Sequence, residues 1–408
     1  MTQQASSGHT PALAAPPLPA TALPPGIRSR FVDGVNGLRV HLLEAGFESD
    51  ARPMVLLLHG FPELAYSWRK VMPALAGAGY HVVAPDQRGY GLTTGWDPRY
   101  DGDLRSFRML NLVKDALALV CALGRRTVHA VVGHDFGSPV AAWCALARPD
   151  VFRSAALMSA PFAGPPALPF GTALASPDGA GAGSAGADAV RRTLSDLAAL
   201  ARPRKHYQWY YSTPEADPDM RSCAQGLHAF LRAYYHVKSA DWERNAPHPL
   251  AAWSAEELAK LPTYYVMDRD RDMAQTVAPH MPSAARIASC HWLPDEELAV
   301  YSEAFARTGF QGGLQWYRCA TGGLNADDLL LFSGRTIDVP SCFVAGASDW
   351  GVYQKPGEFE RMQAGACTRM LGCHLVDGAG HWVQQEQPER VGRLLLDFLA
   401  RAGRPGES

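Results

Sequence analysis

Three residues are of types that together support nucleophilic catalysis: Asp135, Asp349 and His381. Asp135 stands at the centre of GHDFG (133–137), directly after the apolar run 128–132. A buried strand, a polar residue flanked by glycines and the start of a helix together form the pattern of a sharp turn that exposes a nucleophile. Glycines suit such a strained turn because side chains there would collide with the strand and the helix.

Asp349 and His381 also follow predicted strands, in that order along the chain. Because the carboxyl ends of parallel strands meet at one edge of a sheet, we expect all three side chains to lie close together. Asp349 would orient His381 and stabilise its charged form, and His381 would take a proton from water. Asp377 is an alternative partner for His381, but it shares a loop with the histidine and is more typical of a turn residue, so Asp349 is preferred.

An aspartate nucleophile restricts the reaction. Attack on an ester would give an anhydride, whereas attack on a strained or activated sp³ carbon gives an alkyl-enzyme ester. Water could then hydrolyse that ester at the enzyme's own carboxyl carbon, with the backbone N–H groups of Phe61 and Phe136 as the oxyanion hole. Epoxides and alkyl halides both fit. An epoxide oxygen needs an acid, for which tyrosine is suitable, whereas a halide needs donors such as indole N–H groups.

The elements that must position these residues follow from hydrophobic periodicity. Short apolar runs predict strands, and Asn36-Gly37 predicts a hairpin between the first two. Because strands alternate with amphipathic helices, we expect an α/β fold whose mostly parallel sheet has helices on both faces. The predicted strands are 29–35, 38–45, 54–58, 81–85, 128–132, 152–158, 341–345 and 373–376, and the predicted helices are 67–78, 111–123, one ending near 147, and 389–401.

The alternation of strands and helices is interrupted once. Residues 27–161 and 339–408 carry it and predict the two parts of one core, whereas 162–338 is rich in aromatic residues and helical patterns without clear buried strands. This middle segment is predicted to be a helical cap inserted late in the sheet. Its Gly-, Pro- and Ala-rich part, 164–189, is predicted to be a linker, and 1–26 a flexible tail.

Several of these segments resemble the soluble-type epoxide hydrolases of the α/β-hydrolase fold. The core matches are HGFP (59–62), GHDFG (133–137), Asp349 and GHW (380–382), and the cap matches are HYQWY (206–210) and GGLQWYR (312–318). Two departures stand out. The cap is longer than in compact members, and Phe136 replaces the tryptophan that usually follows the nucleophile. Related dehalogenases use that indole to bind halide, so its loss favours an epoxide.

The resemblance implies roles for individual residues. Asp135 is the nucleophile, Asp349 and His381 activate water, and Tyr207 and Tyr317 polarise the epoxide oxygen. It also implies a cis bond before Pro62. Substrate contacts are expected from four further residues: His59, Pro62, Trp316 and Trp382.

Other interpretations remain open. Asp135 could simply cap the following helix. Most aromatic residues of a helical cap serve packing, so the acid could be another of its tyrosines. The tyrosines of this part of the cap are Tyr207, Tyr210, Tyr211, Tyr234, Tyr235, Tyr264 and Tyr265.

The function also has alternatives. The protein could be a dehalogenase with the same nucleophile, or a non-catalytic ligand receptor on this scaffold.

The composition of the chain restricts the kinds of molecule that it is expected to bind. An apolar fraction of 47% predicts a large core, and a net charge of −2 gives no reason to expect nucleic acid or an anionic membrane. No apolar run reaches membrane-spanning length, so we expect a soluble, cytoplasmic protein, monomeric or homodimeric. The eight cysteines form no C-x-x-C pair, and Cys121, Cys144 and Cys342 are predicted to be buried thiols. We expect no metal and no cofactor, only a small apolar epoxide and water.

Overall fold

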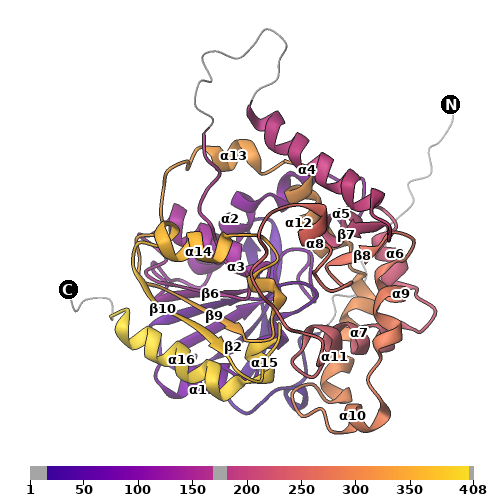
Figure 1. Cartoon of the computed structure of the whole chain (residues 1–408). Helices are drawn as coiled ribbons and strands as arrows, with labels where there is room; N and C mark the ends of the chain where they lie inside the picture. The colour runs from indigo at the N-terminus through magenta and orange to yellow at the C-terminus, as the bar shows by residue number, and fades with distance from the viewer. Residues whose placement is uncertain (1–15, 169–181, 404–408) are drawn as a thin grey trace, which may run out of the picture.

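A central eight-stranded sheet organises the chain, as the computed structural model in Figure 1 shows for residues 16–168 and 182–403. Its strand order is β1-β2-β4-β3-β5-β6-β9-β10. The pairs β1–β2 and β2–β4 are antiparallel, and every neighbouring pair from β4 to β10 is parallel. The strands are β1 (Ile27–Val35), β2 (Leu38–Ala45), β3 (Met54–Leu58), β4 (His81–Pro85), β5 (Ala130–His134), β6 (Ala155–Met158), β9 (Ser341–Gly346) and β10 (Met370–Val376).

The sequence predictions for the core strands are largely confirmed. The bounds of β2, β3 and β4 are those predicted, and the predicted hairpin joins β1 to β2. β5 begins and ends two residues later than predicted, because Val128 forms only an isolated bridge with Phe152 and the buried His134 continues the strand. This extension brings the end of β5 directly to Asp135.

Helices cover both faces of the sheet (Figure 1). α2 and α3 lie on one face, and α1 and α16 lie on the other. α2 and α16 bury the apolar stripes that their periodicity predicts. The helices of the core are η2 (Ala65–Trp68), α1 (Met72–Gly77), η3 (Leu104–Phe107), α2 (Met109–Ala122), α3 (Gly137–Ala147), η6 (Trp350–Val352), α14 (Glu358–Arg361), η7 (Met362–Ala366), α15 (Val383–Glu386) and α16 (Pro388–Arg401).

The segment between β6 and β9 is mostly helical, but it contains a small sheet that the sequence analysis did not expect. β7 (Arg204–His206) pairs antiparallel with β8 (Val266–Asp268). Strands of three residues are too short for an alternating pattern to show in the sequence. The helices of this segment are α4 (Ala182–Ala199), α5 (Tyr207–Tyr211), α6 (Ala216–Arg221), α7 (Leu227–Lys238), α8 (Ala255–Leu258), α9 (Met273–Val277), η5 (Ala278–His280), α10 (Ala284–Ala288), α11 (Asp295–Thr308), α12 (Gln311–Thr321) and α13 (Ala326–Leu330).

Two predicted flexible segments are shorter than expected. The linker prediction 164–189 was wrong for its last part, because α4 begins at Ala182, where alanine becomes frequent and favours a helix. Residues 169–181 lie outside the described residues, as do 1–15. The predicted tail ends before residue 26, since η1 (Ala20–Ala22) is ordered and Leu23 is buried against the core.

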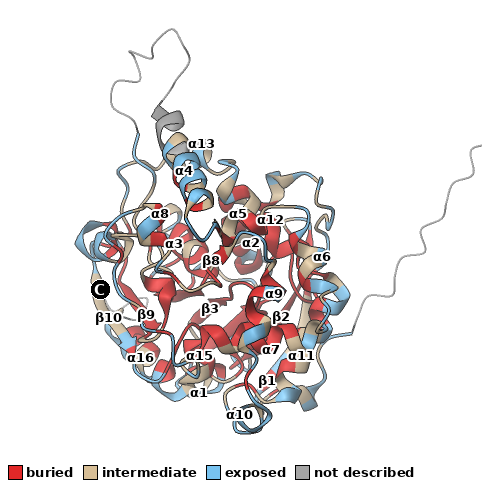
Figure 2. Ribbon diagram, turned by 45° about the vertical axis from the view of Figure 1, so that its right-hand side comes forward, coloured by how far each residue is buried: buried red, intermediate tan, exposed pale blue. Residues whose placement is uncertain are grey.

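The buried residues concentrate on the sheet, on the helix faces that contact it and on helices of the segment between β6 and β9, such as α7 and α12 (Figure 2). All residues of β3, β4, β5 and β6 are buried. The eight cysteines are free thiols, and Cys144 and Cys342 are buried as predicted. The prediction for Cys121 was wrong, because it lies on the exposed side of α2. In the part of the chain that is described, no helix is long and apolar enough to cross a membrane.

Candidate active site

Asp135 occupies a strained turn between β5 and α3. Its φ of 51° lies in the left-handed region, and its N–H donates to the Met158 carbonyl oxygen at 3.1 Å. A Cβ on Gly133 would lie 2.0 Å from the carbonyl oxygen of Gly137, and a Cβ on Gly137 would lie 2.3 Å from that of Leu58. Only glycine fits at both positions, so the two glycines permit the turn that presents the Asp135 carboxylate.

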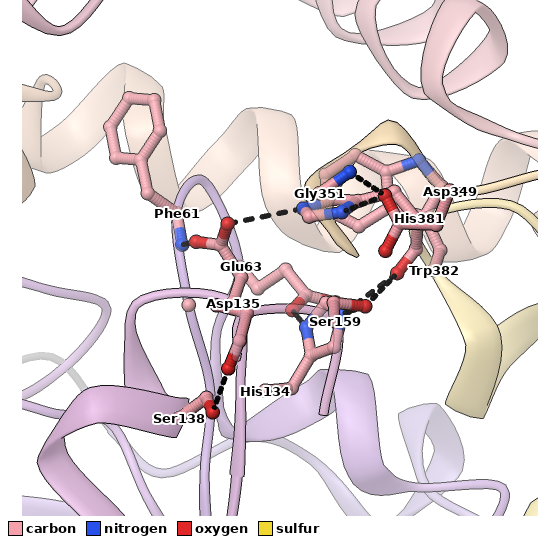
Figure 3. A network of polar contacts seen from close by, with 12 residues as sticks. Phe61, Glu63, His134, Asp135, Ser138, Ser159, Asp349, Gly351, His381 and Trp382 are labelled. Carbon is pink, nitrogen blue, oxygen red and sulfur yellow. Dashed lines mark hydrogen bonds and ion pairs between the residues drawn. The ribbon is translucent and has the colours of Figure 1, made fainter. Parts of the chain in front are cut away.

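The ends of β5, β9 and β10 bring Asp135, Asp349 and His381 together, as Figure 3 shows. His381 Nε2 lies 3.2 Å from Asp135 Oδ2, and His381 Nδ1 lies 3.0 Å from Asp349 Oδ1. The Gly351 N–H also donates to Asp349 Oδ1, at 2.7 Å. Asp377 is exposed in its turn, so the carboxylate paired with His381 is that of Asp349.

Charge and burial act against each other in this triad. Burial by itself would lower the pKa of His381, but the Asp349 and Asp135 carboxylates outweigh it and raise that pKa to about 9. Burial would likewise raise the pKa of both carboxyls, but the His381 charge outweighs it and holds each pKa below its usual value. The resting arrangement is therefore an imidazolium between two carboxylates.

The Phe61 amide holds one oxygen of the nucleophile candidate. Its N–H donates to Asp135 Oδ1 at 2.9 Å, which leaves Oδ2 on the His381 side. The Phe61–Pro62 bond is cis, as the resemblance implies. Phe136, the other residue predicted for the oxyanion hole, directly precedes α3, and its ring packs edge-on against Tyr317 at 5.1 Å between centroids.

Asp135 faces a cavity of about 270 Å³ whose walls come from the core and from the inserted segment. Both predicted tyrosines line it. The Tyr207 hydroxyl donates to Gln354 Oε1 at 3.1 Å and accepts from Gln208 Nε2 at 3.2 Å. The two tyrosine rings lie 6.0 Å apart between centroids. The lining comprises Asp135, Phe136, Pro139, Trp143, Ala160, Pro161, Phe162, Ala163, Gly164, Pro166, Tyr207, Gln208, Tyr317, Ala320, Leu329, Gly351, Val352, Gln354, Lys355 and Glu358.

Both tyrosines are protonated at neutral pH. Burial raises the pKa of Tyr207 and Tyr317 well above 10, and the Asp135 carboxylate raises each further. A phenol that keeps its proton beside a carboxylate can donate a hydrogen bond to an oxygen held at that carboxylate.

Four further residues are predicted to contact substrate, and their hydrogen bonds show what each one touches in the structure. Among the described residues, the cavity lining includes none of His59, Pro62, Trp316 and Trp382. Instead, His59 Nε2 accepts from the Gln87 N–H, and the Pro62 carbonyl accepts from the Tyr235 hydroxyl. The indole N–H groups of Trp316 and Trp382 donate to the carbonyls of Arg88 and Tyr235. The lining also omits Phe61 and His381, so the role of the four residues in substrate binding stays a prediction.

A buried polar network beneath the triad was missed by the sequence analysis (Figure 3). Glu63 Oε2 lies 2.6 Å from His134 Nδ1, and His134 Nε2 lies 2.7 Å from the carbonyl oxygen of His381. Glu63 also accepts from the side chains of Gln384 and Gln385. The network ties the loop after β3 to the His381 loop. The available signal was a glutamate next to Pro62 and a histidine next to Asp135, both in otherwise apolar surroundings.

Comparison with known proteins shows the family to which this fold belongs. A family model described as alpha/beta hydrolase fold matches residues 53–388, so the chain is an α/β-hydrolase. Epoxide hydrolase B of Mycobacterium tuberculosis is 31% identical over 89% of this chain and 96% of its own length, and epoxide hydrolase A of that species is 33% identical over 91% and 96%. A solved epoxide hydrolase from an endophytic Streptomyces has a TM-score of 0.70 at 31% identity, covering 92% of this chain and 96% of that one. The chain belongs to the epoxide hydrolases within this family.

Proposed function

We propose that this enzyme converts an epoxide to a vicinal diol through a covalent ester on Asp135. The observation that carries the proposal is the asymmetric environment of the Asp135 carboxylate. Phe61 N–H binds Oδ1, while Oδ2 lies beside His381 in a cavity that also holds Tyr207 and Tyr317. One oxygen is thereby held where an oxyanion would form, and the other is left to attack carbon.

The first step is alkylation of Asp135. Oδ2 attacks an epoxide carbon, a C–O bond of the ring breaks, and its electron pair passes to the epoxide oxygen. That oxygen takes a proton from Tyr207 or Tyr317, whose hydroxyls remain protonated because burial and Asp135 raise each pKa. The tyrosinate regains its proton from the His381 imidazolium through solvent, which leaves His381 neutral for the second step. Two tyrosines from different helices, α5 and α12, would hold the oxygen between them.

The second step is hydrolysis of the ester. His381 Nε2 takes a proton from water, and the hydroxide attacks Cγ of Asp135. The negative charge then develops on Oδ1, which already accepts the Phe61 N–H, and we assign the Phe136 N–H as the second donor. Asp349 stabilises the imidazolium. Collapse of the intermediate then breaks the bond between Cγ and the alkyl oxygen. That oxygen takes the proton of the new hydroxyl on Cγ and leaves as part of the diol, which restores the Asp135 carboxylate and the His381 imidazolium.

The substrate we propose is small and largely apolar. The cavity of about 270 Å³ has walls from Trp143, Phe162 and Val352 as well as from the two tyrosines. Residues 162–338 would act as the cap that closes this space over the core. An alkyl halide fits less well, because the indole N–H groups of Trp316 and Trp382 are occupied by backbone carbonyls and Phe136 offers none.

The test is product analysis over a panel of aryl and alkyl epoxides and matched alkyl halides, with Asp135→Ala as the control. Diol formation that disappears in the variant supports the proposal. Halide release without diol formation would make the enzyme a dehalogenase. Thermal stabilisation by an epoxide with no product from either panel would indicate a ligand receptor, and the proposal would be wrong.

A further inference from the structure

Lys238 is a buried lysine directly beside the triad. It is the last residue of α7, it is 3% exposed, and its carbonyl accepts the His381 N–H at 2.8 Å. In the described part of the chain, no carboxylate lies within ion-pair distance of its ammonium group. Burying an ammonium without a carboxylate is costly, so its position calls for a physical explanation.

Aromatic rings take the place of a carboxylate. The Lys238 Nζ lies within cation–π distance of five rings that come from four separate segments of the chain. Trp382 directly follows His381, and Tyr207 lines the cavity that Asp135 faces. The distances from Nζ to the ring centroids are 4.9 Å for Tyr265, 5.1 Å for Tyr234, 5.8 Å for Trp382, 5.9 Å for Tyr264 and 6.0 Å for Tyr207.

The charge of Lys238 balances that of the triad. Two carboxylates and one imidazolium carry a net charge of −1, which the ammonium group brings to zero. Alkylation changes this balance, because the Asp135 carboxylate becomes a neutral ester. His381 then keeps the Asp349 carboxylate at Nδ1 and the nearby Lys238, and loses the carboxylate that stabilised its proton at Nε2.

We propose that Lys238 is a positioning residue for the hydrolytic step: its caged ammonium charge keeps His381 neutral in the alkyl-enzyme, so that Nε2 can accept a proton from water. The proposal rests on the function proposed above. It agrees with the direction of the electrostatic effect, since the Lys238 charge lowers the pKa of both His381 and Asp135.

Other groups around His381 do not replace this effect. The Asp349 carboxylate favours the charged imidazole, and so does Glu63, which acts from behind His134. The His134 ring lies 5.1 Å from the His381 ring between centroids, but its Nδ1 is paired with Glu63. The Glu386 carboxyl accepts hydrogen bonds from the backbone N–H groups of Gly380 and Trp382, in the same loop as His381. It is another acidic group and adds no positive charge near His381. Among the described groups named here, Lys238 is the cation that opposes these carboxylates.

The test is the pH dependence of ester hydrolysis in single turnovers of Lys238→Met, which keeps the side-chain length and removes the charge. We expect the profile to move to higher pH by roughly one unit. Hydrolysis would then be about tenfold slower below the kinetic pKa and unchanged well above it, with a normal alkylation rate. Lys238→Arg keeps the charge and should keep the profile. Lys205→Met is the matched control, because Lys205 lies 4.7 Å from the Tyr210 ring on another part of the cap.

An unshifted profile in Lys238→Met, or an equal loss of rate at every pH, would overturn the proposal and leave Lys238 a packing residue. Circular dichroism checks folding, and Lys238→Gln replaces the methionine variant if that one is unfolded. Failure of the proposed function gives a different result, namely no alkyl-enzyme in the wild-type protein at any pH.

Discussion

In the proposed active site, the core and the predicted cap, residues 162–338, contribute by different physical means. The core supplies Asp135, Asp349 and His381, which strand ends and charged hydrogen bonds fix relative to one another. The cap supplies Tyr207, Tyr317 and Lys238, which are held mainly by contacts between aromatic rings. In the proposed mechanism, the charged core residues form and break the bonds to substrate, whereas the cap groups adjust charge and proton position. We therefore expect large effects from changes in the core and graded effects from changes in the cap.

Removal of the nucleophile should have the largest effect. Asp135→Ala leaves nothing to form the ester, so diol formation should fall by about 10⁴-fold or more. The measurement is steady-state turnover of the best epoxide, with circular dichroism to confirm folding. Asp377→Ala is the matched control, because Asp377 is an exposed aspartate close to His381 in sequence. Residual activity within tenfold of the wild-type value would exclude a nucleophilic role.

Removal of the base should separate the two steps. In His381→Gln the first step remains possible, so the ester should accumulate while turnover falls by about 10³-fold. Intact mass spectrometry after mixing with substrate should show the protein heavier by the mass of one epoxide. His228→Gln, at an exposed site on α7, should behave as wild type. Slow turnover without any mass increase would mean that His381 acts before or during alkylation.

The cap tyrosines should give smaller and separable losses. Tyr317→Phe and Tyr207→Phe should each slow alkylation by roughly 10- to 100-fold, because one hydroxyl can partly replace the other, and the double variant should lose considerably more. Single-turnover alkylation rates measure this, with Tyr353→Phe, which lies outside the cavity lining, as the control. If the double variant loses no more than either single variant, only one tyrosine is the acid.

The smallest effect concerns stability rather than rate. The pKa of His381 is raised from 6.5 to about 9 in the folded protein. Its ion pairs therefore contribute fully to the free energy of unfolding below about pH 6.5, and the contribution is lost as the pH rises through 9. Denaturant titrations at pH 6, 8 and 10 should show a difference between wild type and His381→Gln that shrinks by roughly 2–3 kcal/mol over this range. A constant difference would mean that His381 is neutral in the resting enzyme.

The core was largely predictable because its signals are local. A strand, a turn and a chemically active residue follow one another directly at Asp135 and Asp349, so the strand pattern also positions the side chains. Parallel pairing then brings residues far apart in sequence to one edge of the sheet. Asp349 was preferred to Asp377 on a local signal too, because Asp349 follows a predicted strand whereas Asp377 shares the loop of His381 and is typical of a turn.

The cap was less predictable because its arrangement depends on long-range packing. The rings around Lys238 come from separate segments, and a lysine at the end of an amphipathic helix looks like an ordinary exposed residue in the sequence. The same limit applies to Trp316 and Trp382, whose indole N–H groups donate to the backbone carbonyls of Arg88 and Tyr235, contacts that the sequence pattern does not show. Sequence motifs predicted which segments come together, but not which partner each aromatic side chain contacts.

The central claim is that Asp135 forms a covalent ester which water cleaves at the aspartate's own carboxyl carbon. A single turnover with excess enzyme in ¹⁸O-water tests it most directly. We expect one ¹⁸O atom in the peptide that contains Asp135 and an unlabelled diol. Label in the diol, with an unlabelled Asp135 peptide, would show that water attacks the epoxide directly and that Asp135 forms no ester.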